Sequence, residues 1–286
     1  MKTLALPGGA TMPAFGLGTW RYGEQAGRRS AELTALRDAL ALGYRLFDTA
    51  EMYGEGGAET LLGQAIADAL RAGEVRRDEL FIVSKVYPHN ASRRGVPAAC
   101  ERSLKRLQLE RIDLYLLHWR GEHPLAETAA ALQDLVAAGH IAHWGVSNLD
   151  VDDLEELAKA TDPSGAPCAA NQVYYSLGER GPEAALLPWQ RARGLPLMAY
   201  SPIDQGALAA ADMLGALAQP LGLSAAQLAL AWVLAQPGVV AIPKTAQRPH
   251  LRDNLAAAAV ELPADVLAAL DRHFPPPKRK RPLAMI

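Results

Sequence analysis

Four side chains of types that exchange protons lie just beyond short apolar stretches: Asp48, Tyr53, Lys85 and His118. A tyrosine has an ordinary pKa of about 10 and is a poor acid near neutrality, but a neighbouring cation favours the phenolate and lowers that pKa. Lys85 is the candidate cation, and Asp48 would keep it charged and oriented. A neutral His118 would hydrogen-bond a substrate oxygen. The set predicts a proton-transfer site in which Tyr53 is the general acid.

Other polar residues also follow apolar runs. They are Ser147, Asn148, Gln172, Tyr200, Ser201, Lys244 and Thr245. Taken singly, such residues have ordinary explanations: Asp48 as a turn cap, Lys85 as a solvated loop lysine, His118 as a satisfied core histidine. An isolated buried charge is strongly disfavoured, so a lysine and an aspartate that end apolar strands are expected to be paired. Their shared position therefore predicts one pocket.

Short apolar runs bounded by polar or turn residues predict eight buried strands. These are Ala14 to Thr19, Leu46 to Phe47, Leu80 to Val83, Leu114 to Leu117, His143 to Val146, Cys168 to Val173, Leu197 to Ala199 and Val239 to Ile242. Helical spacing of apolar residues lies between them. Ser30 is expected to cap a helix that ends at Gly43, and Ser224 with Gln227 forms a capping-box pattern. Another helix is expected over Glu183 to Arg193, closed by Gly194.

This alternation, without a linker or a change of composition, predicts an α/β protein with one domain over residues 1–286. A (β/α)8 TIM barrel fits it better than a doubly wound sheet, which periodicity alone leaves open. Met1 to Met12 is expected to form an N-terminal hairpin and Ala264 to Phe274 an extra C-terminal helix. In a barrel the carboxyl ends of the strands meet at one rim, where catalytic residues gather.

Composition narrows the function classes. The net charge of −2 and the pI near 6.4 give no overall attraction to nucleic acid or a membrane surface. Two cysteines and the absence of a visible signal peptide favour the cytoplasm, and a monomer is the default. The basic run Lys278 to Arg281 is interpreted as a solvated tail rather than a nuclear signal or phosphate patch. His123 follows His118, but other ligands at zinc spacing are missing, so no metal site is predicted.

The motifs together resemble the aldo-keto reductase superfamily over nearly the whole chain. They are GLGTW (16–20), FDTAEMYGEGGAE (47–59), VSKVYP (83–88), LYLLHW (114–119), GVSNL (145–149), NQVYYS (171–176), AYSPI (199–203) and IPKT (242–245), in the family's order. The chain is most similar to compact bacterial members described as diketogulonate or methylglyoxal reductases. The resemblance implies a barrel that binds NADPH without a Rossmann domain, and the glycines at 16, 18, 54, 56 and 57 do not open a dinucleotide-type unit.

The resemblance also implies residue roles. Asp48, Tyr53, Lys85 and His118 match the family's catalytic tetrad, in which Tyr53 protonates the oxygen of an aldehyde or ketone as hydride reaches its carbon. Ser147, Asn148 and Gln172 match positions that bond the nicotinamide amide, and Tyr200 matches the ring that stacks on it. Lys244 and Thr245 match contacts to the ribose phosphate, while Asp253 and Asn254 match adenine contacts. Thr19, Trp20, Ser201, Ile203 and His250 complete the expected cofactor-binding set.

Two features are less determined. Many family members carry an arginine where this chain has His250, and a neutral imidazole gives less charge to a phosphate than a guanidinium, so NADH also stays open. Trp20, Met52, Tyr87 and Trp119 match the family's substrate pocket and suggest a small or flat carbonyl compound, such as methylglyoxal or a keto-sugar acid. The alternatives are an NADPH-binding redox sensor with little turnover and a lyase that forms a Schiff base on Lys85.

Overall fold

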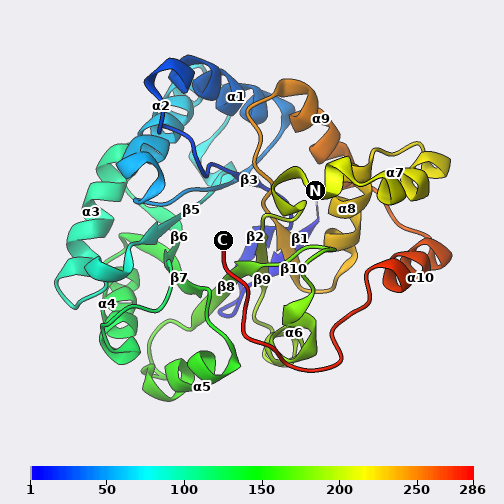
Figure 1. Ribbon diagram of the computed structural model, residues 1–286. Helices are drawn as coiled ribbons and strands as arrows, with labels where there is room; N and C mark the ends of the chain where they lie inside the picture. Colours follow the sequence, from blue (N-terminus) through cyan, green and yellow to red (C-terminus); the bar gives the residue numbers. More distant parts are fainter. Residues whose placement is uncertain (1) are drawn as a thin grey trace.

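The computed structural model describes residues 2–286 and is built around one sheet of eight parallel strands (Figure 1). The strands are β3 (Leu17–Gly18), β4 (Leu46–Asp48), β5 (Phe81–Val86), β6 (Ile112–Leu117), β7 (Ile141–Ser147), β8 (Cys168–Tyr174), β9 (Leu197–Tyr200) and β10 (Val239–Ala241). They pair in sequence order, each with the next. Each strand is joined to the next through one α-helix, except that two α-helices lie between β9 and β10.

The first and last strands of this sheet close on each other. Phe15 forms a parallel bridge with Ala241, the amide of Gly16 donates to the Ala241 carbonyl at 3.0 Å, and the Ala241 amide donates to Ala14 at 3.0 Å. A doubly wound sheet has two open edges, so this closure excludes that alternative. The predicted (β/α)8 barrel is confirmed.

Helices surround the barrel on its outer side (Figure 1). They are α1 (Arg29–Leu42), α2 (Gly57–Arg71), α3 (Gly95–Leu107), α4 (Leu125–Ala137), α5 (Val151–Ala160), α6 (Leu186–Arg191), α7 (Asp212–Ala218), α8 (Ala225–Ala235), α9 (Arg248–Ala257) and α10 (Ala264–His273). The predicted Ser224 capping box is present, and Gly43 ends α1 in the left-handed conformation. The expected helices between the strands are therefore present, with shifted ends.

Two helix predictions were wrong in detail. Ser30 does not cap α1, because a 3-10 turn over Ala26–Arg28 already leads into the helix and Ser30 lies inside it. The helix expected over Glu183 to Arg193 is divided into a 3-10 turn and the short α6. Pro188 explains the division, because proline has no amide hydrogen and its ring would collide with the carbonyl four residues earlier in a continuous helix.

The inside of the barrel holds an apolar layer from alternate positions of the strands. It contains Leu46, Val83, Leu114, Leu116, Ala170, Met198, Val240 and Ile242, together with Leu6 and Met12 from the N-terminal segment. Side chains on a strand alternate between its two faces, so the opposite set packs outward against the helices. The barrel interior is therefore filled below the rim and leaves space only at its mouth.

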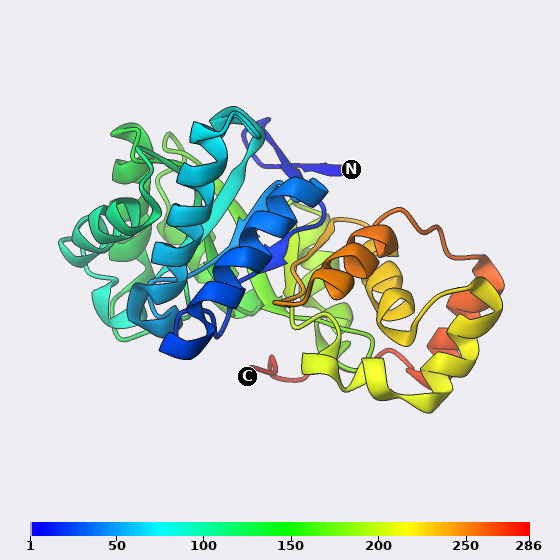
Figure 2. The same ribbon diagram turned by 90° about the horizontal axis from the view of Figure 1, so that it is seen from above.

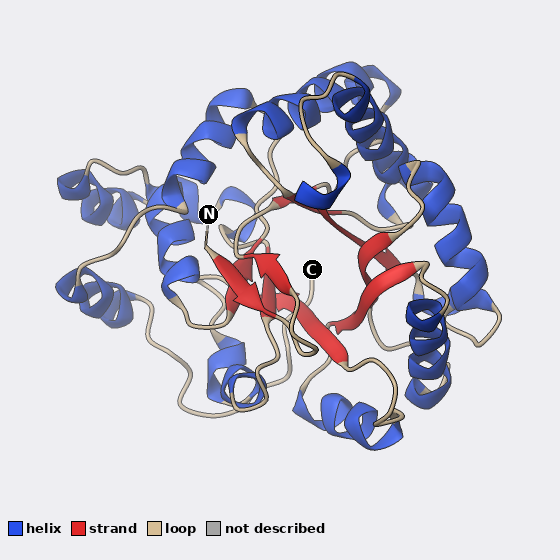
Figure 3. Ribbon diagram, turned by 180° about the vertical axis from the view of Figure 1, so that it is seen from behind, coloured by secondary structure: helices blue, strands red, loops and turns tan. Residues whose placement is uncertain are grey.

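The two chain ends lie at opposite ends of the barrel. The hairpin of β1 (Thr3–Ala5) and β2 (Thr11–Pro13) covers the end where the strands begin, as the view from behind shows (Figure 3). After α10 the chain returns across the other end, so that the C-terminus lies over the barrel mouth (Figures 1 and 2). The expected hairpin and extra helix are both present.

Within residues 2–286, no single helix is long and apolar enough to cross a membrane. The segments Asp212–Leu221 and Ala225–Ala235 reach that length and composition only together, and they meet at a bend of 79°.

Candidate active site

Period-two alternation along the strands places the expected polar residues above the inner apolar layer. Each lies two positions beyond an inward-facing residue: Asp48 beyond Leu46, Lys85 beyond Val83, His118 beyond Leu116, Gln172 beyond Ala170, Tyr200 beyond Met198 and Lys244 beyond Ile242. Two positions along a strand return to the same face. The strand pattern therefore turns these side chains toward the barrel axis at its mouth.

Lys85 is fully buried and is the centre of the polar network. Its Nζ donates to Asp48 Oδ2 at 2.7 Å, to the Thr49 carbonyl at 2.8 Å and to Tyr53 Oη at 3.2 Å. Asp48 Oδ1 accepts a further hydrogen bond from Gln172 Nε2 at 2.7 Å. An ammonium group has three hydrogens to donate, so all of them have partners here. The predicted pairing of Asp48 with Lys85 is present in the structure.

Tyr53 differs from the sequence prediction in its acidity. Burial raises the pKa of Tyr53 well above its ordinary value, and the Asp48 carboxylate raises it further. The expected lowering by Lys85 was wrong chiefly because burial disfavours the charged phenolate, and because Asp48, 2.7 Å from the ammonium, offsets the cation's attraction for it. Tyr53 is therefore a phenol at neutral pH.

His118 lies against Tyr53 and is kept uncharged. The two rings meet edge to face with centroids 5.6 Å apart. Burial lowers the pKa of His118 well below its ordinary value, and the Lys85 cation lowers it further. The imidazole therefore stays neutral, as the sequence predicted, and can offer one donor and one acceptor nitrogen.

A tight turn after β4 brings Tyr53 to this position. Gly54, Glu55 and Gly56 all have positive φ, at 56°, 52° and 87°. A side chain at Gly54 would come within 2.8 Å of the Gly23 carbonyl carbon, so glycine is required by space as well as by conformation. Glu51, which precedes the turn, ties this segment to the chain after β5, since its carboxylate accepts a hydrogen bond from the Tyr87 amide at 2.7 Å.

The network forms the floor of a cavity of about 820 Å³ at the barrel mouth. The predicted residues that line it are Trp20, Asp48, Met52, Tyr53, His118, Trp119, Ser147, Asn148, Gln172, Tyr200, Ser201, Ile203, Lys244, Thr245, His250, Asp253 and Asn254. Three others lie outside the lining. Thr19 and Lys85 are fully buried beneath it, and Tyr87 packs on Trp119 with ring centroids 5.1 Å apart. The fold therefore brings nearly all of the predicted site residues together around one cavity.

The cavity also has walls that the sequence interpretation missed. They include Arg21, Gln205, Gly206, Met285 and Ile286. The last two follow the basic run Lys278 to Arg281, whose side chains are exposed, as expected of a solvated segment. Lys280 pairs with Asp152 at 3.2 Å and Arg281 with Glu179 at 2.7 Å, so the segment is fixed across the mouth. The apolar ending Leu-Ala-Met-Ile (283–286) was the available indication that the end of the chain contacts the cavity.

One part of the cavity wall is rich in neutral hydrogen-bonding groups. Ser147 Oγ donates to the Gln172 carbonyl at 2.9 Å, and Tyr200 Oη donates to Asn148 Oδ1 at 3.0 Å. Tyr174 stacks on Tyr200 at 5.8 Å with an interplanar angle of 12°. These contacts fix a flat ring next to amide and hydroxyl groups, which suits a planar amide-bearing ligand.

Another part of the wall carries cations: Arg21, Lys244 and His250. Burial lowers the pKa of Lys244, and the neighbouring Arg21 and Arg28 act in the same direction against an opposing Glu32. A bound anion would relieve this mutual repulsion of cations. Arg248, by contrast, is paired with Asp38 at 2.9 Å and does not line the cavity.

Comparisons with known proteins agree with this architecture. Residues 14–274 match the model of the Aldo/keto reductase family. This chain belongs to the aldo/keto reductase family. It is 45% identical to the methylglyoxal reductase YeaE of Escherichia coli (strain K12), over 100% of this chain and 99% of that protein. It is 35% identical to a glyoxal reductase of Bacillus subtilis (strain 168), covering 94% of this chain and 91% of the relative.

Solved structures give the same result for the family fold. An aldo-keto reductase from Klebsiella pneumoniae, crystallised in complex with NADPH, superposes with a TM-score of 0.90 at 45% identity. The match covers 100% of this chain and 99% of that one. The family membership makes the chain an oxidoreductase. Within residues 2–286 there is no group of three or more His, Cys, Asp or Glu residues that could hold a metal ion.

Proposed function

We propose that this aldo/keto reductase uses NADPH to reduce a small aldehyde or ketone to the alcohol, with Tyr53 as the proton donor. The observation that carries the proposal is the direction of one hydrogen bond. Lys85 donates to the Tyr53 oxygen at 3.2 Å, so the phenolic hydrogen stays available to another acceptor. Because Tyr53 also lines the cavity, that acceptor is the carbonyl oxygen of a substrate.

The residues support a complete proton transfer. As hydride reaches the carbonyl carbon, the developing alkoxide takes the proton of Tyr53, and the resulting phenolate lies beside the Lys85 ammonium. Asp48 holds the ammonium in place. His118, which is neutral, donates a hydrogen bond that orients the substrate oxygen, and it neither gains nor loses charge in the reaction.

The cavity fits a nicotinamide dinucleotide. Ser147, Asn148 and Gln172 would bond the carboxamide of the nicotinamide, and Tyr200 would stack on its ring. Lys244 with Thr245 would hold the ribose phosphate, with Asp253 and Asn254 at the adenine. The cofactor supplies the hydride when bound. Thr19 and Lys85 are buried below the cavity floor and would not contact the cofactor. Thr19 would act on it only through Asp48, and Lys85 only through Tyr53.

The substrate side is apolar and aromatic. Trp20, Met52 and Trp119 line it, with Tyr87 behind Trp119. Two relatives are named methylglyoxal reductase and glyoxal reductase. We therefore propose small dicarbonyl compounds as the substrate class, taken up by one domain of residues 1–286.

The Schiff-base alternative is disfavoured by the position of Lys85. The amine is fully buried below the cavity and all of its hydrogens have acceptors, so a carbonyl carbon cannot reach it. The redox-sensor alternative predicts the same cofactor binding without turnover. Catalytic rate therefore separates it from the proposed enzyme.

The test is oxidation of NADPH, followed by its absorbance, with methylglyoxal, glyoxal, keto-sugar acids and larger aldehydes. We expect turnover with small dicarbonyls. In Tyr53→Phe, turnover should fall by about 1,000-fold, since general acid catalysis contributes roughly 10² to 10⁴. NADPH affinity, measured by fluorescence titration, should stay within about twofold. A variant that keeps normal turnover would refute Tyr53 as the acid.

A further inference from the structure

The last twelve residues form a strap across the barrel mouth, here defined as Pro275–Ile286. The strap leaves the end of α10, passes the loop after β8 and ends inside the cavity wall with Met285 and Ile286 (Figure 1). Both of these residues are more than half exposed, so they are not held by burial in the core. Something else must fix the course of the strap.

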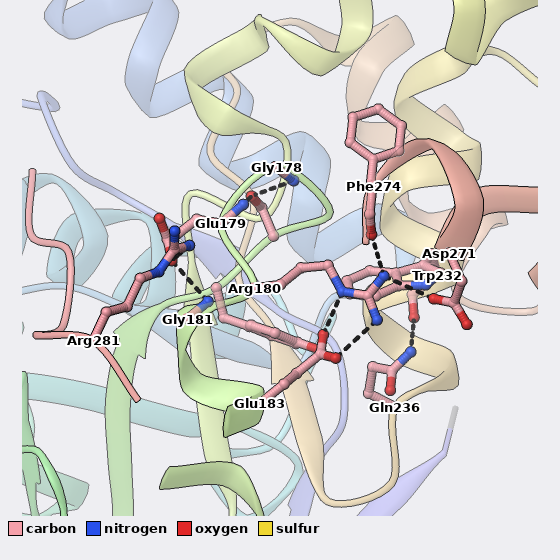
Figure 4. A network of polar contacts seen from close by, with 12 residues as sticks. Gly178, Glu179, Arg180, Gly181, Glu183, Trp232, Gln236, Asp271, Phe274 and Arg281 are labelled. Atoms are coloured by element: carbon pink, nitrogen blue, oxygen red, sulfur yellow. Dashed lines mark hydrogen bonds and ion pairs between the residues drawn. The ribbon is translucent and has the colours of Figure 1, made fainter. Parts of the chain in front are cut away.

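Arg180, in the loop after β8, makes the contacts that do this (Figure 4). Its guanidinium donates to both carboxylate oxygens of Glu183, at 2.7 and 2.8 Å, and to Asp271 at 2.7 Å. It also donates to the carbonyl of Phe274, the residue at which α10 ends. The planar, forked guanidinium group of Arg180 lies over the ring of Trp232 in α8, with its central carbon 4.8 Å from the ring centroid.

These contacts are of an unusually strong kind. Arg180 is only 6% exposed, and its bidentate, charge-assisted bonds need the planar fork of an arginine. They join three separate parts of the chain: the loop after β8, α8 and the end of α10. The start of the strap is therefore fixed at one point relative to the barrel.

Three further ion pairs, made by Arg281 and Lys280, hold the strap beyond that point. Arg281 Nη2 lies 2.7 Å from Glu179 Oε1, next to Arg180 in the chain, and the same carboxylate oxygen accepts the Gly181 amide at 2.8 Å. Lys280 pairs with Asp152 at 3.2 Å and Asp150 at 3.4 Å, where α5 begins. These pairs are exposed and individually weak, so Arg180 carries most of the stabilisation.

We propose that Arg180 is a positioning residue for carbonyl binding, acting through the strap rather than by touching the substrate. By fixing the end of α10 it determines where Met285 and Ile286 lie, and these residues line the same cavity as Tyr53 and His118. This inference rests on the proposed function for its kinetic part. Its structural part, that Arg180 keeps the strap closed, stands independently.

The experiment compares Arg180→Lys with a variant that lacks Met285 and Ile286, and with the combination of the two. Lysine keeps the charge but not the fork. We expect Arg180→Lys to raise KM for methylglyoxal about tenfold while kcat stays within about twofold, the pattern of lost binding. In the variant that already lacks Met285 and Ile286, adding Arg180→Lys should not change KM further, because the residues through which Arg180 acts are gone. Arg272→Ala, on the exposed side of α10, is the matched control and should change neither constant.

Limited trypsin cleavage after Lys278 or Arg279 reports the strap without any turnover. Arg180→Lys should be cut there about tenfold faster than the wild type, because opening frees the segment. Arg281→Ala leaves the fork intact and should show a smaller change in the same direction. If Arg180→Lys is cut at the wild-type rate, or shifts KM equally with and without Met285 and Ile286, the inference is overturned. If the wild type reduces no carbonyl, the proposed function fails and the cleavage rates alone decide the role of Arg180.

Discussion

At the scale of the residue, burial has a different consequence for each titratable group of the site. It raises the pKa of Tyr53, lowers that of His118 and lowers that of Lys85, the last against the opposing effect of Asp48. Each direction follows from the cost of a charge in a low dielectric. The outcome suits reduction, which needs a phenol that still has its proton and an imidazole that stays neutral.

These directions predict the pH dependence of the reaction. Tyr53 has a pKa above about 10 and is protonated at all lower pH values, while His118 has a pKa below about 6.5 and is neutral at all higher ones. We therefore expect kcat/KM for reduction to be flat from pH 7 to about 9. The check is steady-state kinetics in constant-ionic-strength buffers. A fall in rate near pH 7 would contradict the neutral histidine.

His250 is the residue at which cofactor preference can be tested. It lines the same cavity as Lys244, whereas Arg248 is engaged by Asp38. His250→Arg should tighten NADPH binding relative to NADH by about tenfold, because a fixed guanidinium can bond a phosphate bidentately. Fluorescence titrations with both cofactors measure the ratio. Arg252→Ala, an exposed arginine of the same helix outside the cavity lining, is the control.

At the scale of the element, the loop after β9 is a part of the cavity wall with a constrained backbone. Ser201, Asp204 and Gln205 all have positive φ, at 47°, 49° and 54°, although none is glycine. Such conformations are unfavourable and persist where contacts hold them. The Asp204 carboxylate supplies these contacts, since it accepts hydrogen bonds from Tyr174 Oη at 2.8 Å and from Ser176 Oγ.

Loss of the Asp204 carboxylate should therefore loosen this wall. Asp204→Ala removes the acceptor for two hydroxyls and should weaken NADPH binding about tenfold, which corresponds to about 1.4 kcal/mol. Asp204→Asn keeps an acceptor and tolerates positive φ, so it should restore most of the affinity. Asp212→Ala, an exposed acid at the start of α7, is the control. Equal affinities for Asp204→Ala and the wild type would show that the loop does not shape the cofactor site.

At the scale of the whole molecule, barrel closure is the condition for the site. The mouth exists because the chain near Phe15 pairs with β10 on one side. On the other side, Gly16 lets the chain lie close to β4. A side chain at Gly16 would come within 1.9 Å of Leu46 Cδ2 and 2.7 Å of the Leu46 carbonyl. The backbone there has no room to move, because it is paired on both sides.

Gly16→Ala should lower the free energy of unfolding by about 1 to 3 kcal/mol, the usual cost of overpacking. Urea denaturation followed by circular dichroism measures it. Gly215→Ala in α7 is the matched control: nothing lies within 4 Å of its new methyl group, so stability should rise by roughly 0.5 to 1 kcal/mol. An unchanged midpoint for Gly16→Ala would mean that the contact with Leu46 of β4 can widen without cost.

The sequence alone determined the features that depend on local pattern. Alternation of buried strands with helices predicted the barrel, and polar residues at strand ends predicted that Asp48, Tyr53, Lys85 and His118 meet at one mouth. Period two explains this success for Asp48, Lys85 and His118, because a residue two positions past a core residue shares its face. Tyr53 is placed instead by the turn after β4.

Only the tertiary structure decided the features that depend on distant neighbours. The acidity of Tyr53 depends on burial and on how strongly Asp48 offsets Lys85, which no motif specifies. The course of the strap depends on Arg180 meeting Asp271 and Phe274 across more than ninety residues. A local pattern can place a side chain on a face, but its electrostatic surroundings come from elements that only folding brings together.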